Sequence, residues 1–166
     1  TASDASSRDW FGTFVAVAIE GDTIVVGADG EDAYGYNSGA AYIFRTSDGG
    51  ATYGQLQKLT ASDAAAGDMF GLSVAIAGGT IVVGARLDDD GGTNSGSVYV
   101  FRTSDGGATY TQVAKLTAGD AAGGDYFGYS VAIDGVNIMV GAHYDNSDRG
   151  SVYVFRTTDG GATYDL

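Results

Sequence analysis

The sequence predicts an all-β chain built from three copies of one four-stranded unit. The first observation is repetition, because the Phe-Gly pair at residues 11–12 recurs at 70–71 and 127–128. The second is strand-like patterning inside each copy, with turns marked by Gly, Asn, Asp and Ser. The third is composition: 28 of the 166 residues are glycine, none is proline, and helix-period apolar stretches are missing. One copy is about 57 residues long.

The second copy shows the order of the strands. Residues 70–77 alternate larger apolar side chains with Gly, Ser and Ala, which predicts a first strand whose small face permits close approach of a neighbour. Residues 80–85 hold the apolar Ile-Val-Val run of a second strand. Residues 97–103 are apolar on both faces, and therefore predict a strand covered on both sides. Residues 110–116 mix Thr, Gln and Lys with apolar residues, as an outer edge strand does.

These strands describe a blade-like unit. Three inner strands are covered and the fourth is partly in water, an order typical of the blades of a β-propeller. The array divides into repeat 1 at 1–59, repeat 2 at 60–116 and repeat 3 at 117–166, in which the fourth strand is cut short. We therefore expect one domain of three four-stranded antiparallel propeller-type blades. Three blades are too few to close a ring alone, since a ring takes about four to eight.

Composition and charge exclude several classes of function. The chain carries 8 basic and 21 acidic residues, a net charge of −13, which argues against binding to nucleic acid or to an anionic membrane. Its apolar runs fall short of the ~20 residues of a membrane-spanning helix, so no membrane insertion is expected. Cysteine is absent, which removes disulfides, thiolate metal sites and a cysteine nucleophile. The polar opening at residues 1–4 does not have the pattern of a signal peptide.

The motifs of each repeat resemble a known family. Phe-Gly in the first strand, Val-Gly-Ala in the second, and an acidic loop followed by Gly-Ser-Val-Tyr-Val-Phe look like the FG-GAP repeat. That family includes the integrin α-subunit propeller and many microbial surface proteins, and the stretch at 57–63 is similar to the microbial type. The resemblance covers essentially the whole chain, three times over. It implies propeller-type blades, an extracellular setting (secreted or at the cell surface), and binding or adhesion in place of catalysis.

One part of the family pattern is missing. Integrin-type blades carry an Asp-x-Asp-x-Asp-Gly calcium loop between their first two strands, whereas this chain has short connections at 19–23, 77–80 and 133–135. No repeat keeps the oxygen ligands of that loop. The calcium site of the family is therefore not carried over to this chain.

A second resemblance concerns the hairpin between the third and fourth strands. Residues 46–53, 103–110 and 157–164 are similar to the Asp-box of sialidases and other propellers. In that pattern the Asp side chain ties down its own turn and the aromatic residue packs beneath it. The resemblance implies a structural turn role for Asp48, Asp105 and Asp159, and not sialidase activity, because a fold does not bring its chemistry with it.

The acidic loops after each Val-Gly-Ala are candidate cation sites. Calcium takes about six to eight oxygen ligands from carboxylates, amides and carbonyls, and short glycine-containing loops can supply them. The first candidates are Asp88, Asp90 and Asn94, and the weaker ones are Asp29, Glu31, Asp32, Asp145 and Asp148. The alternative is a set of solvated loops that keep the chain soluble, which the differing loop lengths favour. Calcium is the one cofactor that the sequence suggests.

The sequence offers no catalytic set, so we expect no enzymatic activity. Its only histidine, His143, lies where the other repeats have Asp29 and Arg86, and no Ser/His/Asp arrangement accompanies it. Carboxylates recur with the repeat, as structural residues do. A glycosidase instead needs one acid/base pair whose pKa values are separated by their surroundings.

Some aromatic residues differ between the repeats, whereas most recur and are expected in the core. The differing ones are Trp10, Tyr34, Tyr36, Tyr126, Tyr129 and Tyr144. Those beside the acidic loops, namely Tyr34, Tyr36 and Tyr144, are candidate ligand contacts, because an exposed ring offers a surface on which a sugar can stack. Packing between blades is the alternative role.

The expected function follows from the two outermost blade faces. Exposed apolar faces usually mark association surfaces, and faces from one repeat series should fit each other head to tail. We expect an extracellular structural or adhesive protein whose partner is itself, in a closed ring or a filament. One alternative is a fragment of a longer propeller. Another is a ligand-binding module, lectin-like or a calcium-dependent adhesin, whose partner is a glycan or another surface protein.

Overall fold

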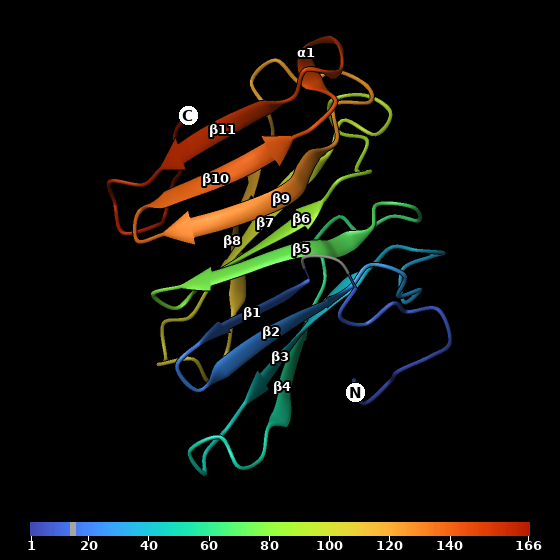
Figure 1. The fold of residues 1–166 in the computed structure, drawn as a ribbon. Coiled ribbons are helices and arrows are strands. Elements are labelled where there is room, and N and C mark those ends of the chain that lie inside the picture. Colours follow the sequence, from blue (N-terminus) through green and yellow to red (C-terminus); the bar gives the residue numbers. More distant parts are fainter. Residues whose placement is uncertain (14–15) are drawn as a thin grey trace.

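The chain folds into three antiparallel sheets that follow one another along the molecule (Figure 1). The structure is a computed structural model and describes residues 1–13 and 16–166. The first sheet has the order β1-β2-β3-β4, with β1 (Val17–Glu20), β2 (Thr23–Ala28), β3 (Ala40–Arg45) and β4 (Gly54–Leu59). The second sheet repeats this order with β5 (Phe70–Ala77), β6 (Thr80–Ala85), β7 (Ser97–Arg102) and β8 (Thr111–Leu116). The third holds β9 (Phe127–Asp134), β10 (Asn137–Ala142) and β11 (Ser151–Arg156).

The predicted all-β fold of propeller-type blades is confirmed. In the second blade, β5 and β6 have the predicted bounds, while β7 ends one residue earlier and β8 begins one residue later than expected. Both differences lie at the Asp-box hairpin. The hydroxyl of Thr103 donates a hydrogen bond to Asp105 in the turn, and the ring of Tyr110 packs into the core.

The third blade differs from the other two in having three strands. Arg156 and Asp165 exchange two backbone hydrogen bonds, of 2.7 and 2.9 Å. The same pairing opens the fourth strand in the other blades, where Arg45 lies opposite Gly54 and Arg102 opposite Thr111. Asp165 thus occupies the first position of a fourth strand.

A single helical turn, α1 (Asp145–Asp148), lies in the loop between β10 and β11. Across the described residues, no helix has the length and apolar character needed to cross a lipid bilayer.

Consecutive blades pack face to face, so that their innermost strands β1, β5 and β9 lie in sequence (Figure 1). The first interface buries Val25 and Ile43 of one sheet against Phe70 and Phe101 of the next. The second interface repeats this with Val82 and Val100, which are fully buried against the following blade. Burial of apolar area, at roughly 25 cal/mol per Å², is the main force that holds the blades together.

The glycines of the repeat motifs are placed where these blades touch. A Cβ atom built on Gly27 would lie 1.8 Å from the carbonyl oxygen of Gly71, and one on Gly84 would lie 2.1 Å from that of Gly128. The Val-Gly-Ala glycines of the first two blades therefore receive the backbone of the next blade's Phe-Gly. Only a residue without a side chain permits this approach, which explains why both motifs recur together.

Candidate functional site

The acidic loop of the second blade is closed around a lysine. The ammonium of Lys115, on β8, lies 2.7 Å from a carboxylate oxygen of Asp63, 3.0 Å from Asp88 and 2.5 Å from Asp90. Carboxylate oxygens of these three aspartates lie within 4.8 Å of one another, close enough to surround one cation. We call Asp63, Asp88, Asp90 and Lys115 the lysine-centred cluster.

The charges of this cluster stabilise one another. Burial alone would lower the pKa of Lys115, but hydrogen bonds with Asp63, Asp90 and Asp88 raise it above its ordinary value. Burial acts to raise the pKa of Asp63, yet the contacts with Lys115 and Tyr99 lower it overall. The Tyr99 hydroxyl, with a single hydrogen to donate, lies 2.8 Å from a carboxylate oxygen of Asp63 and 2.9 Å from one of Asp88. Calcium could enter here only by displacing the ammonium of Lys115.

The first blade has a smaller version of the same cluster. The ammonium of Lys58 lies 2.7 Å from Asp4 and 2.8 Å from Glu31, and it stands over the ring of Tyr42 at 5.4 Å. In the third blade the hydroxyl of Tyr153 lies 2.7 Å from a carboxylate oxygen of Asp120 and 2.8 Å from one of Asp145.

The other predicted cation ligands are distributed over separate contacts. Asp29 accepts from the hydroxyl of Thr13, and Asp32 accepts the backbone N–H of Asn37. The backbone N–H of Asn94 donates to Asp89. The side chain of Asp148 lies outside the part of the chain that the structure describes.

Sequence reasoning chose Asp88 and Asp90 but missed two members of the cluster. Asp63 comes from the segment before the blade, and Lys115 comes from its last strand. A signal was present, because Lys58 and Lys115 hold equivalent places in their repeats, as do Asp4 and Asp63. Reading those repeated opposite charges as partners would have found the cluster.

The three Asp-box hairpins form the same hydrogen bonds. In the second blade, Asp105 accepts from the hydroxyl of Thr103 at 2.7 Å, and from the backbone N–H and hydroxyl of Thr109 at 2.9 and 2.7 Å. Equivalent bonds surround Asp48 and Asp159. Bonds from the two threonines hold the pKa of Asp105 well below its usual range.

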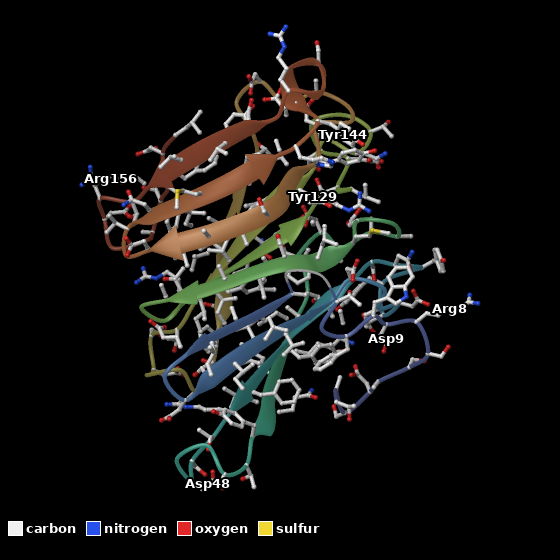
Figure 2. The ribbon with its side chains drawn as sticks, in the orientation of Figure 1. Arg8, Asp9, Asp48, Tyr129, Tyr144 and Arg156 are labelled. Atoms are coloured by element: carbon white, nitrogen blue, oxygen red, sulfur yellow. The ribbon has the colours of Figure 1, made fainter. Side chains whose placement is uncertain are left out.

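At the opposite end of the strands from Asp48, the loops enclose a cavity of about 790 Å³. Figure 2 shows Tyr129 and Tyr144 at this end of the molecule, and Asp48 at the far end. The volume lies within the range typical of small-molecule sites, about 300–1,000 Å³. We call it the end cavity. Apart from Tyr144, its lining residues come from the same three repeat positions in each of the three blades.

The first position is the residue just before Phe-Gly. It is Trp10 in the first blade, Met69 in the second and Tyr126 in the third, and all three line the end cavity. Their φ angles are +53°, +55° and +55°, in the left-handed region that side-chain-bearing residues rarely adopt. The second position follows Phe-Gly and holds Thr13, Leu72 and Tyr129.

The third position follows Val-Gly-Ala and holds Asp29, Arg86 and His143. Asp29 is buried, and this desolvation raises the pKa of its carboxyl above the usual value. The guanidinium of Arg86 lies over the ring of Tyr126 at 5.5 Å and donates from Nη2 to Sδ of Met69 at 3.3 Å. The cavity lining therefore holds one carboxyl group, one guanidinium and the imidazole of His143.

Aromatic rings of the third blade form one wall of the end cavity. His143 lies between Tyr129 and Tyr144, with ring centroids 4.2 and 4.0 Å away, and stacks on Tyr126 at 5.8 Å. Of the three tyrosines predicted as ligand contacts, Tyr144 lines this cavity. Tyr34 and Tyr36 are exposed elsewhere, and Tyr34 borders a separate groove beside Lys58.

Comparison with known proteins adds the following. A solved structure of an α-L-arabinofuranosidase mutant from Fusarium graminearum, in complex with an iminosugar inhibitor, matches with a TM-score of 0.48 and 16% identity. The match covers 82% of this chain but 42% of that one, so the chain spans less than half of the matched structure. A likeness of this degree transfers no chemistry. No curated relative matches the chain.

The FG-GAP repeat matches three times, over residues 1–44, 53–101 and 110–155. Each match takes in the first three strands of one blade, the second and third also include the fourth strand of the blade before, and together they cover most of the chain. This confirms the resemblance of the motifs. This chain belongs to the FG-GAP repeat family.

Proposed function

We propose that this β-propeller-like domain is a non-enzymatic extracellular module, structural or adhesive, that joins copies of itself head to tail. The third blade's outer face receives the first blade's outer face of another copy. The observation that supports this most directly is a comparison of equivalent positions in the three blades.

The outer face of the third blade is apolar and open. In the second blade, Val82, Val98 and Val100 pack against the next blade and have 0% exposure. Their equivalents in the third blade are Met139, Val152 and Val154, with exposed fractions of 42%, 70% and 50%. Residues of the same apolar character thus occupy the same positions, with a neighbouring blade in one case and solvent in the other.

The outer face of the first blade is open in the same way. Val17 and Ile19 on β1 are exposed, although the equivalent Val74 on β5 is buried against the preceding blade. Beside them, Ile24 and Phe44 line a groove of about 380 Å³. In the second blade the equivalent face packs against the first blade. The outer face of the first blade is therefore the surface that would contact a preceding blade.

The two faces belong to one repeat series, so another copy is the natural occupant of each. Such head-to-tail contacts close into a ring where the rotation permits and otherwise extend as a filament. A contiguous apolar face of this kind on an acidic, water-exposed molecule is the usual mark of an association surface.

The clusters of charged groups support a non-enzymatic role. Carboxylates in equivalent positions make equivalent structural bonds: Asp9, Asp68 and Asp125 each accept the backbone N–H three residues earlier, at 2.6 to 2.7 Å. Lys58 and Lys115 neutralise the acidic loops from within the chain. The same pairing favours association that does not depend on calcium.

The first experiment measures the mass of the native particle by light scattering. We expect multiples of the 16.8 kDa chain, with a six-bladed dimer at roughly twice that mass or longer polymers visible in electron micrographs. Val152→Asp, which places a charge on the open face, should reduce the particle to the single chain. Val113→Asp on β8 is the control, since Val113 is also exposed but belongs to an outer strand.

Two results would refute the proposal. A monomeric unaltered chain at high concentration would exclude self-association. Equal loss of mass in Val152→Asp and Val113→Asp would mean that the open face has no special part in it.

A further inference from the structure

We propose that the end cavity binds an uncharged saccharide ring, held between aromatic side chains and hydrogen-bonded to Asp29 and Arg86. This site is separate from the outer blade faces, so the inference stands whether or not copies of the chain associate.

The repeats differ from one another at positions that line the end cavity. The blades share Phe-Gly, Val-Gly-Ala and the Asp-box, yet the residue before Phe-Gly changes from Trp10 to Met69 to Tyr126. The residue after Val-Gly-Ala changes from an acid to a base to a histidine. The glycines of these motifs are the same in each blade, whereas these two positions are not. These variable positions meet in one cavity.

The residues before Phe-Gly have an unusual backbone conformation. Trp10 and Tyr126 adopt positive φ, where glycine is the favoured residue, and both line the end cavity. A large side chain in this region strains the backbone. Retaining a bulky aromatic at such a point suggests that its ring is needed inside the cavity.

Several aromatic rings of the end cavity are open to solvent. Trp10, Tyr129 and Tyr144 are exposed although they line a concave surface. Flat, rigid rings lose little conformational entropy on contact, and each offers an apolar face beside a polar edge. A ligand with a flat apolar face and polar rim complements such walls.

The end cavity carries side chains of opposite charge. The carboxylate of Asp29 and the guanidinium of Arg86 line the same cavity. An anionic ligand would be attracted by one group and repelled by the other, and a cationic ligand likewise. A neutral ring with several hydroxyl groups can donate to the carboxylate and accept from the guanidinium together. Saccharides combine this rim with apolar C–H faces.

The test uses Trp10, the only tryptophan of the chain, as an internal reporter. Its fluorescence is titrated with methyl glycosides of neutral hexoses and pentoses, with an N-acetylated hexosamine, and with leucine as a zwitterion. We expect a saturable change in emission with at least one neutral sugar, at millimolar concentrations.

Three variants locate the binding. Tyr129→Ser and Tyr144→Ser remove exposed rings from the cavity and should weaken binding about two- to tenfold, the worth of one aromatic contact. Tyr34→Ser is the matched control, because this exposed tyrosine lies outside the cavity, and it should bind as the unaltered chain does. The melting temperature of each variant shows whether the fold is kept. If one of the two cavity variants does not fold, the other still tests the site.

The inference is overturned by any of three results. No emission change with any sugar would exclude the site, and a response to leucine alone would assign the cavity to zwitterions. A sugar response that neither cavity variant weakens would place the sugar elsewhere on the chain.

Discussion

At the scale of single residues, Lys115 takes the place that a bound cation would hold. Replacing Lys115 by Met keeps an unbranched stem but removes the charge that Asp63, Asp88 and Asp90 share. We expect the free energy of unfolding at pH 7, measured in urea, to fall by about 1–3 kcal/mol. The loss stays below that of a fully buried pair because Asp63 and Asp90 are exposed.

Lys58→Met is the matched control for this substitution, since two carboxylates surround Lys58 in place of three. Its loss of stability should be smaller. Millimolar calcium should restore part of the stability of Lys115→Met, because three carboxylates without an ammonium present oxygen ligands to a hard cation. Unchanged stability on removal of Lys115 would contradict this account of the cluster.

The Asp-box turns predict a loss of stability in acid. Hydrogen bonds from the turn threonines hold the pKa of Asp48, Asp105 and Asp159 below the unfolded value of about 3.9. Such a carboxyl contributes stability that is fully present above its unfolded pKa and is lost as the pH falls through its folded pKa. The melting temperature should therefore decline below about pH 4.

The triple variant D48N/D105N/D159N isolates this contribution. An amide does not titrate in this range. The melting temperature of the triple variant should therefore change less between pH 5 and pH 2 than that of the unaltered chain. Parallel curves for the two proteins would mean that other carboxylates govern the acid transition.

At the scale of strands, the sequence signals were local and therefore readable. Alternation of large and small residues gave the bounds of β5, and the apolar run gave β6. The charged cluster was harder to predict because Asp63 and Lys115 are 52 residues apart and meet only once β8 lies beside β7. The end cavity was harder still, since it requires three blades to be stacked before its walls meet.

The contact between strands of neighbouring blades leads to a prediction about Gly84 on β6. A methyl group there would lie 2.1 Å from the backbone carbonyl of Gly128 on β9, and this backbone can move only if the blades separate. We expect Gly84→Ala to lower the free energy of unfolding by about 3 kcal/mol or more, as severe overpacking does. Urea unfolding measures the change, and a loss below about 1 kcal/mol would show that the blades adjust easily.

At the scale of the whole molecule, Gly141 separates folding from assembly. It is the third-blade equivalent of Gly27 and Gly84, but a Cβ atom there would meet the side chain of Ser130, with Oγ at 2.5 Å and Cβ at 3.8 Å. In the double variant Ser130→Ala, Gly141→Ala the remaining contacts, with Cβ and the backbone oxygen of residue 130 at 3.8 Å, are of ordinary van der Waals length. We therefore expect its urea unfolding to match that of Ser130→Ala.

The same methyl group would obstruct a docked copy. If the first blade of another copy lies on the third blade as consecutive blades do within the chain, the Gly12 carbonyl of that copy comes to Gly141 as that of Gly128 comes to Gly84. The double variant should then be folded but reduced to the 16.8 kDa chain in light scattering, while Ser130→Ala alone keeps the larger particle. A folded double variant that still assembles would mean that copies associate through some surface other than the blade faces.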